Sequence, residues 1–152
     1  MNRFKFLILI SIFFFFVDNS YSQDSALRLD IKPEKITVRN GGAVSVMTKI
    51  INPGRIVQHL QIWSCSYYDN WIVDNPFVKL EAWPCNKNFF EAVTLKPGED
   101  YANRLSLKIT VPAEEILVEK LVFKLGFKRS ADEQTSVIWS RPIKMEIKEN
   151  IH

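Results

Sequence analysis

The stretch Lys120-Leu121-Val122-Phe123-Lys124-Leu125-Gly126-Phe127-Lys128 decides the fold class. Its large apolar side chains stand at every second position from 121 to 127, and lysines stand at 120, 124 and 128. A period of two puts alternate side chains on opposite faces of a β-strand, so the stretch predicts a strand with one buried face and one solvated face. Residues 143–148 repeat the pattern. We therefore expect two strands that cover the same core.

The alternation extends outward along the chain. Apolar and polar residues alternate over 44–50 and 105–111, and apolar strands are predicted near 60–65 and 77–83, with a turn-rich segment at 66–76 between them. Turn sequences separate the runs, as at Asn40-Gly41-Gly42, Asn52-Pro53-Gly54 and Lys96-Pro97-Gly98. No amphipathic helix of useful length occurs. The sequence thus predicts an all-β protein, an immunoglobulin-like antiparallel β-sandwich of about eight to nine strands with one disulfide.

The first 22 residues are typical of a cleavable export signal. Arg3 and Lys5 precede an apolar run over residues 6–17, and small residues at Ser20 and Ser22 supply the positions that a signal peptidase reads. The run has about half the roughly 20 residues that a membrane-spanning helix needs. We expect residues 1–22 to be removed and residues 23–152 to form a single domain in the periplasm or outside the cell.

The chain has two cysteines, Cys65 and Cys85. An even count in an exported protein predicts a disulfide, because the compartment is oxidising. A redox or metal-binding pair is the alternative, but the spacing differs from the C-x-x-C pattern. Closing a loop of this length stabilises a fold by about 3 kcal/mol in the chain-entropy model.

The charge and the histidines argue against several function classes. The net charge is +3, with 20 cations and 17 acids. A surplus this small makes no case for a nucleic-acid partner or an anionic membrane surface. The two histidines, His59 and His152, stand far apart in sequence, and neither offers a convincing general base or copper-ligand set. We expect no enzyme, no cofactor and no metal.

Aromatic residues gather between Trp63 and Phe90. Core packing accounts for some of them, and the rest are candidates for a contact surface, since exposed rings bury much area at little entropic cost. The binding candidates are Tyr67, Tyr68, Trp71, Phe89 and Phe90. Within the same segment, the pairs Asp69-Asn70 and Asp74-Asn75 favour ordinary turns, with a Ca²⁺ site as the alternative.

Several motifs together resemble the bacterial intracellular proteinase inhibitor (BsuPI-type) domain. They are Lys49-Ile50-Ile51-Asn52-Pro53-Gly54, the strand over 60–66, Tyr68 with Asp74, Trp83, Phe89, and Val93-Thr94-Leu95-Lys96-Pro97-Gly98-Glu99. The resemblance covers about residues 44–110. It implies an immunoglobulin-like sandwich and a protease-inhibiting activity, although the export signal and the cysteine pair depart from an intracellular family.

The sequence thus favours an exported, non-enzymatic domain that binds a protein partner through the aromatic, disulfide-tied region. A protease inhibitor acting through the same region is the second hypothesis. A carbohydrate-binding module that uses Trp71 is the third.

Overall fold

The computed structural model describes residues 27–112, 120–130 and 137–148. The predicted export signal, residues 1–22, lies outside these ranges, as does His152. No helix in the described ranges combines the length and the apolar character needed to span a bilayer. The elements are β1 (Arg28–Pro33), β2 (Thr37–Arg39), β3 (Ala43–Ile51), β4 (Gln58–Trp63), the 3-10 helix η2 (Tyr67–Asn70), β5 (Trp71–Val73), β6 (Val78–Leu80), β7 (Phe90–Leu95), β8 (Asp100–Ile109), β9 (Lys120–Phe123), β10 (Leu125–Lys128), β11 (Val137–Trp139) and β12 (Ile143–Lys148).

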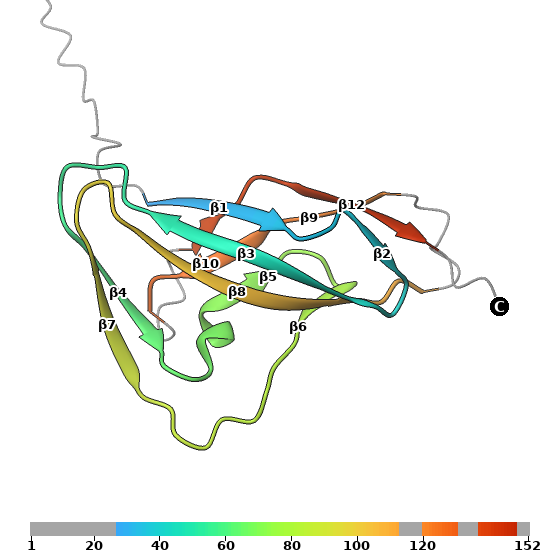
Figure 1. The fold of residues 1–152 in the computed structure, drawn as a ribbon, viewed down its shortest axis with the longest axis horizontal. Helices are drawn as coiled ribbons and strands as arrows, with labels where there is room; N and C mark the ends of the chain where they lie inside the picture. The colour runs from blue at the N-terminus through green and yellow to red at the C-terminus, as the bar shows by residue number, and fades with distance from the viewer. Residues whose placement is uncertain (1–26, 113–119, 131–136, 149–152) are drawn as a thin grey trace, which may run out of the picture.

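One layer of the sandwich is an antiparallel sheet in the order β1-β3-β8-β6. Its centre is the long register between β3 and β8, which runs from Ala43 opposite Lys108 to Ile51 opposite Asp100. Alternate residues of both strands are buried, so the alternation predicted over 44–50 and 105–111 is confirmed. This pair of strands, which we call the trunk, runs diagonally across Figure 1.

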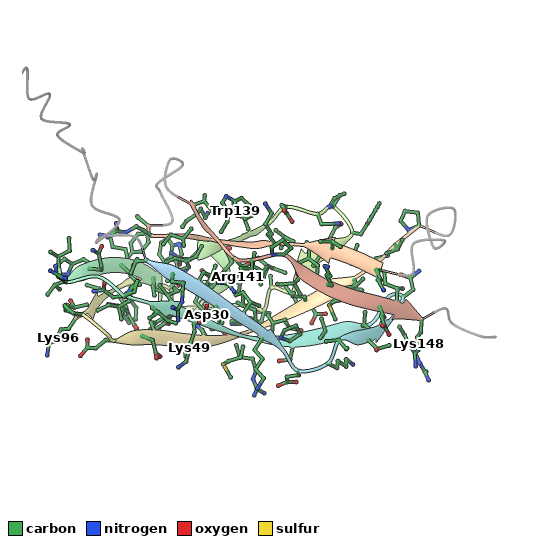
Figure 2. The ribbon with its side chains drawn as sticks, turned by 90° about the horizontal axis from the view of Figure 1, so that it is seen from above. Asp30, Lys49, Lys96, Trp139, Arg141 and Lys148 are labelled. Atoms are coloured by element: carbon green, nitrogen blue, oxygen red, sulfur yellow. A yellow bond between two sulfur atoms is a disulfide. The ribbon has the colours of Figure 1, made fainter. Side chains whose placement is uncertain are left out.

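The second layer consists of two three-stranded sheets, β2-β12-β9 and β11-β10-β5. The stretch 120–128 passes through both: β9 pairs with β12, and after Lys124 β10 pairs with β11 and β5. The side chains of Leu121, Phe123, Leu125 and Phe127 face the core, whereas Val122 between them is 47% exposed. Figure 2 shows the two layers edge-on along the length of the molecule.

The first strand changes sheets at Pro33. β1 pairs antiparallel with β3 in the first layer, whereas β2 pairs parallel with β12 in the second. Pro33 ends β1 at a sheet edge, where a missing N–H donor is tolerated.

The core lies between the layers and draws on both. Among its fully buried side chains, Val46, Leu105, Leu107 and Ile109 come from the first layer. The second layer contributes Phe123, Leu125, Phe127 and Met145. No described buried side-chain polar atom lacks a hydrogen-bond partner.

The predicted all-β, immunoglobulin-like sandwich with one disulfide is confirmed, and the predicted number of strands is too small. Twelve strands occur in the described ranges. The run over 120–128 is divided between β9 and β10, and the three-residue strand β11 had no counterpart in the prediction. β5 lies inside the segment 66–76, which was predicted to be turns. A strand of three residues is too short to show a readable period, so its pairing partner defines it.

A two-stranded arm leaves the trunk at Asn52. The antiparallel pair β4–β7 continues the path of β3 and β8 beyond this corner, and Figure 1 shows it turning away from their shared end. The buried Asn52 side chain donates to the carbonyl oxygens of Ile56 and Leu95 and accepts from the N–H of Gly54. Gly98 has φ +82°, a conformation that favours glycine, and its N–H donates to Asn52. The two predicted turns therefore form one corner.

Candidate functional site

The far end of the arm carries a stacked pair of aromatic rings. Trp63 at the end of β4 lies opposite Phe90 at the start of β7. Their ring centroids are 3.7 Å apart and their planes differ by 25°. Cross-strand neighbours on one face are close enough for such contacts, so the register of the arm builds the pair.

The two strand ends are fastened to each other beyond the rings. The predicted disulfide between Cys65 and Cys85 is present, with a Cα–Cα distance of 5.9 Å. The Asn88 side-chain oxygen accepts from the backbone N–H groups of Cys65 and Ser66, both at 3.3 Å. Ser64 N–H donates to the carbonyl oxygen of Phe89 at 2.9 Å. The tip of the arm is thus held by one covalent bond and several hydrogen bonds.

The segment 86–92 is exposed throughout. Phe89 is 60% exposed and Phe90 is 38% exposed, although both are large apolar side chains. Exposed rings of this size, held in fixed positions, are suited to an intermolecular contact. We define the arm tip as Trp63, the Cys65–Cys85 bridge, and residues 86–90.

Tyr67 and Tyr68 lie beside the arm tip and are half-buried. Both rings pack edge-on against Trp83, with centroid distances of 4.9 and 4.6 Å. The Tyr67 hydroxyl donates to the carbonyl oxygen of Arg104, and that of Tyr68 donates to the carbonyl oxygen of Trp83. These contacts support the segment that leads from Trp83 to the arm tip.

Burial changes the acidity of two phenols in this region. Burial raises the pKa of Tyr67 above its ordinary value. Burial also raises the pKa of Tyr101; its hydrogen bond with Asn103 acts in the opposite direction, and the Glu91 carboxylate adds to the rise. Both phenols are therefore more firmly protonated than a free tyrosine.

Trp71 belongs to the core. It is 5% exposed and its ring packs edge-on against Phe127 at 5.1 Å. The five predicted binding residues therefore do not form one exposed patch: Phe89 and Phe90 are exposed, Tyr67 and Tyr68 are half-buried against Trp83, and Trp71 is inside. A sugar has no access to the Trp71 ring that the carbohydrate hypothesis used.

The Asp and Asn residues near β5 hold backbone together. The buried Asn70 side chain accepts from Trp63 N–H and donates to the carbonyl oxygens of Gln61 and Lys128, which joins β4 to the end of β10. Asp74 accepts from Lys124 N–H at 2.6 Å. No group of three or more His, Cys, Asp or Glu residues in the described ranges is arranged to hold a metal ion.

His59 is the histidine that the structure describes. It is exposed on β4, and its Nδ1 lies 3.3 Å from the Thr94 hydroxyl. Among the residues that the structure describes, the side chain recorded in hydrogen-bond contact with the His59 ring is Thr94 and not a carboxylate, which a general base of the catalytic-triad type would require.

Trp63 is the aromatic residue of the arm tip that was missing from the five predicted contact residues. The contact of Trp63 with Phe90 depends on the pairing of β4 with β7, and this pairing cannot be read from the sequence alone. Several residues that carry the BsuPI resemblance have structural roles: Asn52, Leu95 and Gly98 build the corner, and Tyr68 packs on Trp83. Phe89, which also belongs to that set, is exposed.

Comparisons with known proteins place the chain in no family. No protein-family model matches the chain, and no curated protein matches it. Among solved structures, it is similar to the sporulation control protein Spo0M from Bacillus subtilis, with a TM-score of 0.49, 12% identity, and coverage of 82% of this chain and 50% of that chain. A β-glucosidase from Listeria innocua has a TM-score of 0.36 and 12% identity over 82% of this chain and 16% of that chain.

The chain thus spans half the length of the first of these proteins and about one sixth of the second. At this identity, a likeness in fold carries no information about activity. The resemblance to the BsuPI-type domain stays a prediction.

Proposed function

We propose that this protein is an exported, non-enzymatic binding domain that recognises a protein partner through the arm tip. The observation that carries the proposal is the exposure of Phe89 and Phe90 at the end of a two-stranded arm. The disulfide supports the export part of the proposal, because disulfides persist in oxidising compartments.

The arm tip meets two physical requirements of a contact site. Large rings supply much of the binding free energy in protein interfaces when they enter a pocket of the partner. The bridge and the Asn88 hydrogen bonds already fix the backbone that carries the rings, so less conformational entropy is lost on association.

Photo-crosslinking in the source cells tests the proposal. A photoreactive phenylalanine analogue is placed at Phe89 or, as the control, at Ile56, which is 55% exposed on the turn at the other end of the arm. We expect one discrete crosslinked protein from position 89 and none from position 56. The purified partner should then bind the wild-type protein and the Ile56→Ala variant equally, and bind the Phe89→Ala/Phe90→Ala variant at least about tenfold more weakly. Equal crosslinking from both positions, or partner binding that survives the double substitution, would overturn the proposal.

Protease inhibition is a second candidate, favoured by one specific observation. Residues 86–89 form an exposed run directly after Cys85, and Asn88 fastens this run from within through its side chain. An exposed segment fixed at both ends can occupy a protease cleft without the flexibility that speeds cleavage. Lys87 and Phe89 are the exposed side chains that would enter a specificity pocket.

Inhibition assays separate the two candidates. A panel of serine and cysteine proteases is assayed with the purified protein and with Lys87→Ala, Phe89→Ala and Ile56→Ala variants. An inhibitor should lose its effect on a lysine-specific protease with Lys87→Ala, or on an aromatic-specific protease with Phe89→Ala, and keep it with Ile56→Ala. No inhibition across the panel would reject this candidate and leave the protein-binding proposal standing.

A further inference from the structure

One face of the β2-β12-β9 sheet concentrates positive charge. Arg39 lies opposite Lys148 across the parallel pair β2–β12. In the antiparallel pair β12–β9, Glu146 lies opposite Lys120, and Lys144 lies opposite Val122. These residues alternate with buried ones, so all of them face solvent on the outer side of the sheet. The outward cations of this face, with Lys35 just before β2, are Lys35, Arg39, Lys120, Lys144 and Lys148, and its carboxylate is Glu146.

The surplus on this face exceeds the net charge of the chain. Five cations and one carboxylate give the described residues of this face a charge of +4, whereas the complete sequence has +3. The remainder of the chain therefore has nearly equal numbers of positive and negative side chains. The net charge of the sequence does not show this, because the fold gathers the cations on one face.

No ion pair within the described ranges neutralises the cations of this face. On the opposite sheet, Lys49 pairs with Asp100 at 2.9 Å and Arg104 pairs with Glu34 at 3.2 Å. Across the described ranges, the structure records no such ion pair for any of the five cations of the β2-β12-β9 face. Their charges stay available for an external anion.

Three of the five cations line one groove. Lys35, Arg39 and Lys148 border a groove of about 470 Å³ between β2, the end of β12 and the start of β3. No acidic residue is among the described residues that line it. Like charges directly opposite each other, as Arg39 and Lys148 are, destabilise a sheet. An anion held between the two side chains removes that repulsion.

We propose that this face binds an acidic polysaccharide, a linear chain that carries carboxylate or sulfate groups. The cations lie on or beside three neighbouring strands, β2, β12 and β9, and positions 144 and 148 of β12 lie about 13 Å apart along the strand. Several acidic groups of one chain therefore contact the face at once. The described residues of this face include no aromatic ring, whereas proteins that bind single-stranded nucleic acid without sequence preference stack bases on such rings.

A membrane surface fits the face less well. Peripheral helices that lie on membranes insert several large apolar side chains beside their cations. Val122 is an exposed large apolar side chain on this face, and Ile36, which lines a groove together with Lys144, is exposed at its edge. These two side chains are fewer than such helices insert. The site also lies far from the arm: Figure 2 places Lys148 and Lys96, at the base of the arm, at opposite ends of the molecule. The inference is therefore independent of the proposed function.

Binding of defined polymers tests the proposal. The purified protein is titrated at low and physiological salt with polygalacturonate, dextran sulfate and uncharged dextran, and also with oligo-thymidine and phosphatidylglycerol vesicles. The test variant is Arg39→Gln/Lys148→Gln. The matched control is Lys49→Gln/Lys96→Gln, which removes the same charge from exposed sites away from this face.

We expect wild-type protein to bind at least one of the two acidic polysaccharides, more weakly at higher salt, and to ignore uncharged dextran. The test variant should lose at least about tenfold in affinity and the control variant less than about twofold. Equal losses in the two variants would show that net charge alone drives binding. That outcome, the absence of binding to both acidic polymers, or tighter binding to oligo-thymidine or the vesicles would each overturn the proposal.

Discussion

Two aromatic pairs in this protein differ in what surrounds them. Trp71 and Phe127 meet edge-on at 5.1 Å between the layers, where they are 5% and 0% exposed. Trp63 and Phe90 stack at 3.7 Å on the arm, where Phe90 is 38% exposed. Ring contact alone therefore does not separate a core pair from an exposed pair. The second layer of the sandwich covers the first pair, and no described element covers the second.

The largest expected effect comes from truncating the core pair. Phe127→Ala removes a fully buried ring and should lower the free energy of unfolding by about 3–5 kcal/mol, since lost transfer free energy and a cavity add together. Phe90→Ala should cost about 1 kcal/mol or less, because its ring is already partly in water. Urea unfolding of both variants measures the difference. Similar losses of unfolding free energy in the two variants would contradict the distinction between a buried and an exposed aromatic pair.

Removing the disulfide tests how firmly the arm tip is held. Cys65→Ser/Cys85→Ser should lower the free energy of unfolding by about 3 kcal/mol, because the bridge closes a loop between residues 20 positions apart. Hydrogen exchange should rise at Ser64, Cys65 and Phe89 and stay unchanged in the trunk. Increased exchange throughout β3 and β8 would instead mean that the arm and the trunk unfold together.

The corner between the arm and the trunk depends on one amide. Asn52→Ala leaves the carbonyl oxygens of Ile56 and Leu95 without their donor and should cost about 2 kcal/mol. Asn103→Ala serves as a control, because that side chain is only partly buried and bonds locally. Thermal unfolding compares the two. A smaller effect for Asn52 than for Asn103 would contradict the role of the corner.

The smallest expected effect is on the stability of the fold at alkaline pH. Burial raises the pKa of Tyr67, so the unfolded chain releases this proton at a lower pH than the folded protein does. Its contribution to stability is complete below a pH of about 10 and declines as the pH rises further. Tyr67→Phe should therefore flatten the fall in unfolding free energy above that pH. An identical slope in the wild-type protein and the variant would show that other groups cause the fall.

Most of the trunk could be predicted from the sequence, and the exposed rings of the arm tip could be predicted only in part. The side chains of residues 44–50 and 105–111 alternate without interruption, so their burial follows from the period. Trp71 and Phe89 carry no such pattern, because both lie where the chain turns between short strands. The pairing of β5 with β10 buries Trp71, whereas the pairing of β4 with β7 leaves Phe89 outside.

By itself, the sequence determined the all-β class, the alternating core strands, the turns and the Cys65–Cys85 bridge. Each depends on local period, on backbone preferences of particular residues, or on the fact that only two cysteines exist. The tertiary structure decided which rings are exposed and how the charges are distributed. Phe90 lies opposite Trp63, and Arg39 lies opposite Lys148, only because strands that are far apart in the sequence pair with each other. Strand pairing decides which side chains are buried and which charges lie together. Composition and local sequence pattern therefore cannot predict either.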